Sequence, residues 1–366
     1  MLKRFVSGKN FLYTQNNQHA FGFTNALYIL GTPEENYLPD AVVCVPYSYK
    51  NNILNKTHSA ISFYPVEKQI VLTDQEDLSE VQASQNCIPF KSLTTKAEYL
   101  KRVASLKKHI QRGDIYEINF CMEFVTENVS IDPFRVFHAL NKLGSPPYAA
   151  LARLNNTYII SASPELFLHK QGSRLITKPI KGTCKRGCDE ASDILLKQNL
   201  QNSLKEQTEN VMIVDVARND FSILAQKASV EVPALFAIES FKTVHQMVST
   251  VSCRLKPEVT FKDIIHANFP MPSMTGAPKI RAMELIDSHE QFSREIYSGT
   301  LGYIDSKGDF TLSVLIRTLV YDTANKTLSF AVGSAITHLC DPEEEYQECL
   351  LKAEALLKSV NGIIAQ

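Results

Sequence analysis

Pairs of strand-like runs separated by short polar turns are the feature that most restricts the fold of this chain. Such runs lie at residues 148–153 with 157–162, 165–169 with 174–180, and 297–304 with 310–321 and 327–333. Short turns join antiparallel neighbours, because parallel strands need a crossover of a dozen or more residues. Helical patterns come in blocks between these pairs. The order therefore predicts an α+β fold with antiparallel sheets, not a parallel doubly wound fold.

The helical blocks are expected from apolar periodicity and from start and stop signals. Four of them are predicted near residues 190–215, 260–268, 277–288 and 343–359. A capping box at Thr95 opens a fifth, which ends at Gly113, and a strand should follow at 115–121. Asp132 as N-cap and Gly144 as the residue after the last turn bracket a sixth helix.

Length and charge limit the partners of such a fold. The 366 residues exceed the roughly 250–300 that one core usually serves, which favours two lobes or one large layered domain. The 38 Lys and Arg against 39 Asp and Glu give a formal net charge of −1, so no basic surface for nucleic acid or anionic membrane is expected. We see no signal peptide and no apolar run of 18 residues, and eight scattered cysteines suit a reducing cytoplasm. Small-molecule chemistry in the cytoplasm is the expectation.

Two Glu-x-x-Glu spacings in separate predicted helices are the pattern that most clearly suggests a functional site. Glu206 and Glu209 form one pair, and Glu345 and Glu348 form the other. Residues three apart share one helix face, so two facing helices would offer the oxygen ligands that Mg²⁺ prefers. On spacing alone, solvent-exposed helix glutamates explain the pattern better.

Three other segments carry polar residues that a purely structural chain does not need. Residues 275–279 open a helix with free N–H groups and a lysine, which suits a carboxylate or phosphate. Arg317 lies in the apolar run 312–319, where a buried guanidinium needs an anion and a wet strand face is the equal alternative. His245 has apolar neighbours and by itself fits a core histidine better than a catalyst.

Taken together, ordered blocks across residues 95–360 resemble the chorismate-utilising enzymes. These blocks are residues 113–119, 161–165, 179–183, 209–220, 244–249, 269–279, 296–299, 316–318 and 345–348. The resemblance implies two large, mostly antiparallel sheets packed face to face with helices outside. It also implies a β-rich N-terminal part at 1–90, reduced relative to the family, and a chorismate-binding catalytic core at 91–366. We find no tryptophan-binding Leu-Leu-Glu-Ser-like segment in the N-terminal part and expect no bound tryptophan.

The resemblance also assigns roles around one substrate. Glu209 and Glu348 would hold Mg²⁺, with Glu206 and Glu345 in support, and the metal would bind the ring carboxylate of chorismate. The enolpyruvyl carboxylate would be bound by a second set of residues, namely Tyr297, Arg317, Lys352 and the backbone around Gly333, Ser334 and Ala335. A dicarboxylate needs both a metal and an arginine if it is to lose its water at tolerable cost.

The catalytic residues implied by the resemblance are Lys181, Glu165, His245 and Thr275. Lys181 occupies the position at which aminodeoxychorismate synthases carry a lysine thought to act as nucleophile, whereas anthranilate synthases carry alanine there. Glu165 would protonate the departing ring hydroxyl and later act as base, which requires a raised pKa. His245 and Thr275 would lie beside the ring. The nitrogen would come from ammonia or a separate glutaminase subunit, since no Gly-x-Cys-x-Gly segment occurs.

Departures from the family pattern keep two alternatives open. Glu117 replaces the lysine of the water-activating isochorismate and salicylate synthases, which disfavours that branch, and it also differs from the glutamine usual in the aminating branches. Met271-Pro272 and Ser334-Ala335 stand where glycines are common. The alternatives are an anthranilate synthase and a catalytically silent homologue that binds a glutaminase.

Overall fold

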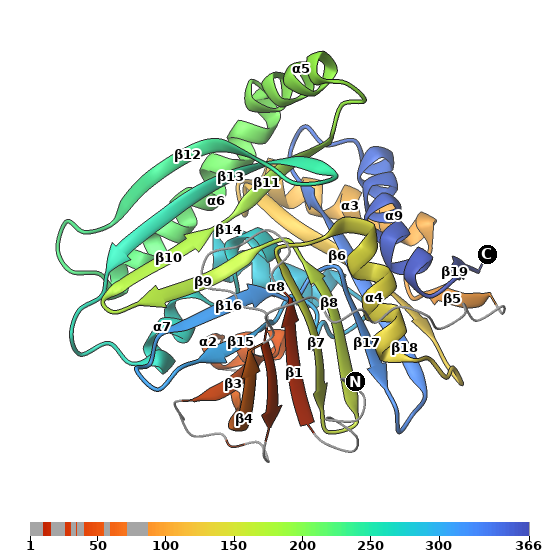
Figure 1. The fold of residues 1–366 in the computed structure, drawn as a ribbon. Helices are drawn as coiled ribbons and strands as arrows, with labels where there is room; N and C mark the ends of the chain where they lie inside the picture. Colours follow the sequence, from red (N-terminus) through yellow and green to blue (C-terminus); the bar gives the residue numbers. More distant parts are fainter. Residues whose placement is uncertain are drawn as a thin grey trace.

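The computed structural model describes residues 10–15, 26–30, 34, 40–54, 59–71 and 87–365, and these form one layered α+β body (Figure 1). Its helical segments are η1 (Tyr47–Tyr49), α2 (Lys50–Ile53), α3 (Lys96–Gln111), α4 (Pro133–Gly144), α5 (Glu190–Gln201), α6 (Leu204–Leu224), α7 (Phe261–Asn268), η2 (Pro272–Met274), α8 (Lys279–His289) and α9 (Pro342–Ser359). None of the helices in the described ranges has the length and hydropathy needed to cross a bilayer.

The strands form two large sheets. The first sheet contains β5 (Ile88–Ser92), β14 (Gly276–Ala277), β6 (Glu117–Thr126), β18 (Thr327–Ile336), β17 (Thr318–Asp322), β8 (Thr157–Ser163), β7 (Tyr148–Leu154), β1 (Asn10–Gln15) and β2 (Ala26–Leu30). The second contains β12 (Glu231–Ser240), β13 (Val244–Arg254), β10 (Arg174–Lys178), β11 (Ile180–Lys185), β9 (Leu166–Gln171), β16 (Phe310–Val314), β15 (Thr300–Ile304) and β3 (Ala41–Val45). The pairings named here are antiparallel, as the sequence predicts.

Two further strands complete the pairing. β4 (Ser62–Val71) pairs with β2 of the first sheet and with β3 of the second, so it joins the two sheets. β19 (Gly362–Ile364) runs parallel to β5. β1 pairs with β7, and β3 pairs with β15, so the described strands of residues 1–90 are built into the same two sheets as the rest of the chain. Much of the predicted N-terminal part lies outside the described residues.

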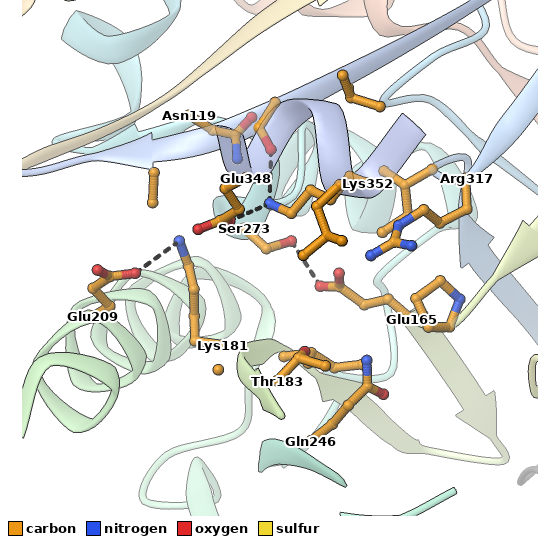
Figure 2. Close-up of a pocket in the computed structure, with 18 of the residues that line it drawn as sticks. Asn119, Glu165, Lys181, Thr183, Glu209, Gln246, Ser273, Arg317, Glu348 and Lys352 are labelled. Carbon is orange, nitrogen blue, oxygen red and sulfur yellow. Dashed lines mark hydrogen bonds and ion pairs between the residues drawn. The ribbon is translucent and has the colours of Figure 1, made fainter. Parts of the chain in front are cut away.

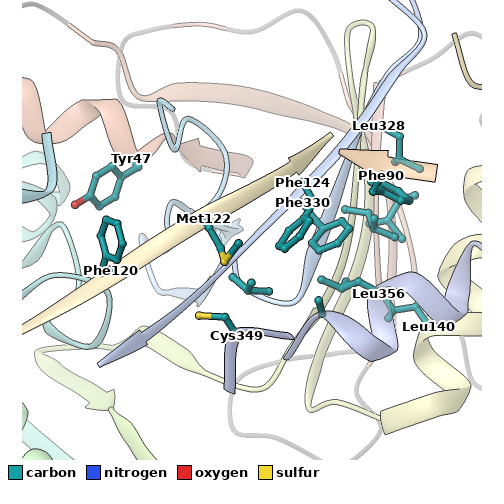
Figure 3. Close-up of a cluster of buried hydrophobic side chains, with 14 of the residues drawn as sticks. Tyr47, Phe90, Phe120, Met122, Phe124, Leu140, Leu328, Phe330, Cys349 and Leu356 are labelled. Atoms are coloured by element: carbon teal, nitrogen blue, oxygen red, sulfur yellow. The ribbon is translucent and has the colours of Figure 1, made fainter. Parts of the chain in front are cut away.

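Apolar side chains hold the layers together. One cluster joins the first sheet to α3, α4 and α9, and there Phe330 of β18 stacks on Phe124 of β6 with ring centroids 5.0 Å apart (Figure 3). A second cluster joins the second sheet to α6 and α7. A third contains residues of both sheets, among them Leu12, Ile159 and Val42. The sheets therefore pack face to face with helices outside, because each apolar face must be buried against another layer.

The helix starts follow their sequence signals closely. Thr95 accepts a hydrogen bond from the backbone N–H of Glu98 while Glu98 bonds back to Thr95, which confirms the predicted capping box. Asp132 caps α4 as predicted, but the helix runs through Gly144. The left-handed residue that ends α4 is Ser145, with φ 45°, so placing Gly144 in that role was wrong.

Two predicted elements are interrupted. The single helix expected near 190–215 is two helices, because the chain breaks at Asn202 and Ser203 and the Ser203 hydroxyl caps the start of α6. The single strand expected at 310–321 is also two, because β16 belongs to the second sheet and β17 to the first. The chain changes sheets between them, and Arg317, with φ 52°, makes the corner. The predicted strand at 115–121 is the first half of the longer β6.

Candidate functional site

A cavity of about 470 Å³ lies where the chain crosses between the two sheets (Figure 2). One crossing joins β8 to β9 and contains Glu165, and the other joins β16 to β17 and contains Arg317. The two crossings are bonded to each other, since the N–H of Val314 donates to the carbonyl of Glu165 and the N–H of Ala162 donates to the carbonyl of Arg317. Helices α6 and α9 also contribute to the lining. The cavity has the size usual for a small-molecule site.

Four glutamates line the acidic part of this cavity. Glu206 and Glu209 come from α6, and Glu345 and Glu348 come from α9, so the two predicted Glu-x-x-Glu pairs do meet. Each of three has a lysine nearby, as three ion pairs show: Lys352 Nζ lies 2.6 Å from Glu348 Oε1, Lys205 Nζ lies 3.5 Å from Glu345 Oε1, and Lys181 Nζ lies 3.8 Å from Glu209 Oε2. The lysines partly offset the negative charge that the glutamates bring together.

Burial controls the protonation of these acids. It raises the pKa of Glu209 to about 7 against the attraction of Lys181, and it raises the pKa of Glu206 and of Glu345 as well. Burial would also raise the pKa of Glu348, but Lys352, together with Lys205 and Lys181, outweighs burial and the pKa is lowered. Ionised carboxylates brought this close need positive charge, which a bound cation supplies.

The donor set suits a divalent cation. Oε1 of Glu209 is buried and has no hydrogen-bond partner among the described residues, and all four glutamates offer the oxygen ligands that Mg²⁺ takes. The described residues contain no preformed group of three or more His, Cys, Asp or Glu side chains arranged to hold a metal. These residues could hold Mg²⁺ only with other oxygens, such as those of water or a bound ligand, completing the shell.

Lys181 lies between two carboxylates at the edge of the acidic part. Its ammonium group donates to Oε1 of Glu117, whose side chain is 1% exposed, and it also faces Glu209. Burial would lower the pKa of Lys181, but the charges of Glu117 and Glu209 outweigh burial and raise it. Oε2 of Glu117 has no partner among the described residues. The lysine is therefore held as a cation, with a spare acceptor beside it.

Glu165 lies across the cavity from Glu209 (Figure 2). Burial raises the pKa of Glu165 to about 7, against the hydrogen bond that Ser273 Oγ donates to Oε1 at 2.7 Å. A carboxyl group whose pKa lies near neutral pH can give up and take back a proton, which is the property that an acid and base at this position needs.

Positive charge gathers next to the acidic part, where Lys352 pairs with Glu348 and Arg317 lies close enough to feel the same carboxylate. The guanidinium of Arg317 points into the cavity and has no hydrogen-bond or ion-pair partner among the residues described (Figure 2). Tyr297, Gly333, Ala335 and Lys352 line the same side, and Lys352 Nζ donates to the carbonyl of Gly333 at 2.7 Å. A Cβ on Gly333 would lie 2.4 Å from Cys121 Sγ, so only glycine fits there. An uncompensated arginine in a cavity is a binding site for an anion.

A family model described as "chorismate binding enzyme" matches residues 15–358. The chain belongs to the chorismate-binding enzymes. A probable chloroplastic aminodeoxychorismate synthase from Oryza sativa is 40% identical over 73% of this chain and 30% of its own length. Aminodeoxychorismate synthase component 1 from Escherichia coli is 34% identical over 88% of this chain and 71% of its own length. Anthranilate synthase component 1 1 from Haloarcula marismortui is 37% identical over 76% of this chain and 56% of its own length.

Solved structures show the same fold. Anthranilate synthase component I from Streptococcus pneumoniae aligns with a TM-score of 0.75 at 24% identity, over 95% of this chain and 92% of that one. The menaquinone-specific isochorismate synthase from Escherichia coli aligns with a TM-score of 0.76 at 16% identity, over 97% and 90%. This chorismate-binding enzyme therefore has the expected fold. It spans about a third of the length of the rice relative.

Three predicted residues of this chorismate-binding enzyme do not line the cavity. His245 is buried on the opposite face of β13, where its Nδ1 lies 2.8 Å from Ser240 Oγ and its Nε2 lies 3.0 Å from Asp193. Thr275 donates to the carbonyl of Met271, and the hydroxyl of Ser334 bonds to that of Tyr99. All three side chains support neighbouring backbone or core groups.

The start of α8 was suggested as an anion site by the sequence. Pro278 is the N-cap residue of α8, and no side chain among the described residues caps the helix. Lys279 cannot serve a bound anion there, because its ammonium pairs with the buried Asp220 at 2.5 Å and also donates to the carbonyl of Asn268. This lysine ties α8 to α6.

Three residues that line the cavity of this chorismate-binding enzyme were not predicted from the sequence. Gln246, next to His245, lines the cavity because successive strand residues face opposite sides. Ser273 bonds Glu165 across 108 residues of chain, and Asn119 reaches the cavity from β6. The alternation of β13 could have shown that only one of His245 and Gln246 faces a ligand. Nothing in the sequence pairs Ser273 with Glu165.

Proposed function

We propose that this protein is the chorismate-aminating component of an aminodeoxychorismate synthase, which converts chorismate and ammonia into 4-amino-4-deoxychorismate and water. The observation that carries this proposal is Lys181. It is a buried lysine in a cavity with a proton acceptor, Glu117, on one side and a candidate metal ligand, Glu209, on the other. The aminodeoxychorismate synthases among the relatives support the same choice.

Binding comes first. Chorismate is a dicarboxylate, and the cavity has two regions suited to its two anionic groups. Arg317 and Tyr297 would take the enolpyruvyl carboxylate on one side. Glu209 and Glu348, supported by Glu206 and Glu345, would hold Mg²⁺ on the other. The ion would act as a Lewis acid that binds and polarises the ring carboxylate.

Amination then takes two substitutions. The neutral amine of Lys181 forms a bond to C2 of the ring while the ring double bonds shift, the bond from C4 to its hydroxyl breaks, and Glu165 donates the proton that lets the hydroxyl leave as water. Ammonia then bonds to C4 by the reverse shift, the bond from C2 to Lys181 breaks, and Glu165, now a carboxylate, takes the surplus proton from nitrogen. The raised pKa of Glu165, about 7, suits both roles.

Lys181 must lose a proton before it attacks. Oε1 of Glu117 already accepts a hydrogen bond from this ammonium group, which makes Glu117 the nearest base for that proton. The nitrogen would come from free ammonium or from a separate glutaminase subunit in the cytoplasm, in keeping with the word "component" in the name of the Escherichia coli relative.

The test is direct. Purified protein is incubated with chorismate, Mg²⁺ and ammonium, and a lyase that releases p-aminobenzoate from aminodeoxychorismate is added. We expect p-aminobenzoate. Anthranilate fluorescence instead would support the second candidate, an anthranilate synthase, which the Haloarcula marismortui relative favours. No turnover with ammonium or with a glutaminase partner would point to a silent homologue.

The substitution Lys181→Ala isolates the lysine. We expect at least about a 100-fold loss of p-aminobenzoate formation, because the nucleophile is gone. Lys178→Ala is the matched control, since Lys178 lies three residues away and pairs with Glu239 outside the cavity. Unchanged rates in Lys181→Ala would remove this residue from catalysis, provided that both variants melt within a few degrees of the unmodified protein.

A further inference from the structure

We propose that Ser273 is a positioning residue for Glu165, fixing the carboxyl group at the cavity wall and stabilising its ionised form so that it can change between acid and base. Ser273 Oγ donates to Glu165 Oε1 at 2.7 Å, and the two side chains come from segments 108 residues apart. Both residues are buried and both line the cavity. This inference rests on the proposed function, in which Glu165 moves the proton of the leaving hydroxyl.

The turn that carries Ser273 is held tightly. The N–H of Met274 donates to the carbonyl of Met271 at 3.0 Å, and the hydroxyl of Thr275 donates to the same carbonyl at 3.1 Å. Arg294 Nη1 donates to the carbonyl of Met274 at 2.6 Å. Thr275, which does not face the cavity itself, thereby helps to aim the serine beside it.

The same arginine ties this turn to the rest of the site. Arg294 Nη2 donates to the carbonyl of Asn119, another residue of the cavity wall. Glu165 is held from its own side, because its carbonyl accepts from the N–H of Val314 and the Ser163 hydroxyl accepts from the N–H of Glu165. Both partners of the serine–glutamate bond are therefore fixed by their backbones, so the bond orients the carboxyl group and does not merely follow it.

Two opposing effects act on this carboxyl group. Burial favours the neutral acid, while the hydroxyl of Ser273, the positive charge of Lys181 and the backbone of Ile180 favour the carboxylate. The balance leaves the pKa of Glu165 at about 7, so neither form dominates at neutral pH. Without the hydroxyl, burial would prevail and Glu165 would keep its proton to a higher pH. It would then remain an acid but become a poor base for the second substitution.

The first test follows turnover. We would measure kcat/KM for chorismate from pH 6 to 9 at constant total ammonia, and divide each variant by the unmodified protein so that ammonia titration cancels. For Ser273→Ala we expect the apparent pKa assigned to Glu165 to rise by about one unit, the size of one hydrogen bond to a charged group. Ser273→Thr keeps a hydroxyl and should restore most of the profile. A Ser273→Ala profile that superimposes on that of the unmodified protein overturns the proposal.

A second readout needs no turnover. Because the serine stabilises mainly the ionised carboxylate, the loss of unfolding free energy in Ser273→Ala should grow as the pH rises through 7, and should not do so in a Glu165→Gln background. Ser313→Ala is the control, since Ser313 is also buried but donates to the backbone carbonyl of Leu301. If chorismate is not turned over but this pH-dependent coupling is seen, the proposed function fails and the Ser273–Glu165 interaction stands. If Ser313→Ala shows the same pH dependence, the coupling is not specific and the proposal fails.

Discussion

Two buried ion pairs lie close to β6, and they differ in how completely they are bonded. Arg294 and Glu290 are 1% and 2% exposed, and the guanidinium bonds both carboxylate oxygens, two backbone carbonyls and the face of Tyr47. Lys181 and Glu117 are 9% and 1% exposed, but Oε2 of Glu117 and Oε1 of the neighbouring Glu209 have no partner among the described residues. The first pair is complete, and the second leaves buried carboxylate oxygens without a partner.

This difference in bonding separates an ion pair that stabilises the fold from one that belongs to the functional site. An ion pair with every group bonded gains nothing from a ligand, so Arg294 and Glu290 hold β6 to the turn at Met274. An ion pair with spare acceptors beside a cavity is costly until something fills it. Buried groups left unsatisfied in this way are typical of sites that bind or react.

The largest effect is expected for the complete pair. Arg294→Met should lower the free energy of unfolding by roughly 3–5 kcal/mol, because it leaves Glu290 buried without a counter-charge. Urea unfolding at pH 7 would measure this loss. The double variant Arg294→Met/Glu290→Met should recover part of it, since no isolated charge remains. A loss below about 1 kcal/mol in the single variant would mean that this pair is not the structural element described above.

The comparison also shows what a sequence can and cannot reveal. Hairpin pairs, the capping box at Thr95 and the N-cap at Asp132 are local, because the groups involved lie within a few residues of one another. The break at Arg317 is not local, since it exists only because β16 and β17 belong to different sheets. An apolar run cannot show which of its residues makes that turn.

The candidate site shows the same contrast between local and distant contacts. The Glu-x-x-Glu spacing correctly grouped Glu206 with Glu209 and Glu345 with Glu348, because one helix presents each pair. The partners of these groups come from distant segments, as Lys181 with Glu117 and Ser273 with Glu165 show. A single sequence has no local pattern that reveals contacts between such distant segments. Alternation along β13 shows two faces but does not show which one meets the cavity.

A second prediction tests the incompletely bonded pair through pH. Burial raises the pKa of Glu209 from 4.5, the ordinary value of a glutamate, to about 7 in the folded protein, so between those values the folded state holds a proton that the unfolded state has lost. Stability must therefore fall as the pH rises from 5 to 7, and stay low above 7. Glu209→Gln removes the share of this dependence that Glu209 contributes, so without metal it should be more stable than the unmodified protein at pH 8, by roughly 1–3 kcal/mol.

Denaturant unfolding at pH 5 and pH 8 in the presence of a chelator would show this difference. Glu354→Gln is the control, because Glu354 is exposed on the same helix as Glu348 and, among the described residues, pairs with Lys358 alone. Addition of Mg²⁺ at pH 8 should stabilise the unmodified protein but not Glu209→Gln, since a ligand that binds only the folded state raises its stability. Equal pH dependence in the unmodified protein and in Glu209→Gln would contradict a raised pKa at Glu209.

The smallest expected effect concerns Lys205, a lysine beside the acidic part of the cavity. Lys205 lies 3.5 Å from Glu345, and its charge also acts on Glu206, Glu209 and Glu348, so it partly replaces a cation there. Lys205→Met should therefore tighten Mg²⁺ binding about two- to five-fold, the effect of one exposed charge pair. Calorimetric titration without chorismate measures it, and the gain should shrink at high salt because Lys205 is 53% exposed. Lys358→Met, which removes another exposed lysine paired with a glutamate, at the far end of α9, should leave the affinity unchanged. Weaker binding in Lys205→Met would mean that this lysine supports the metal site instead of competing with the ion for its glutamates.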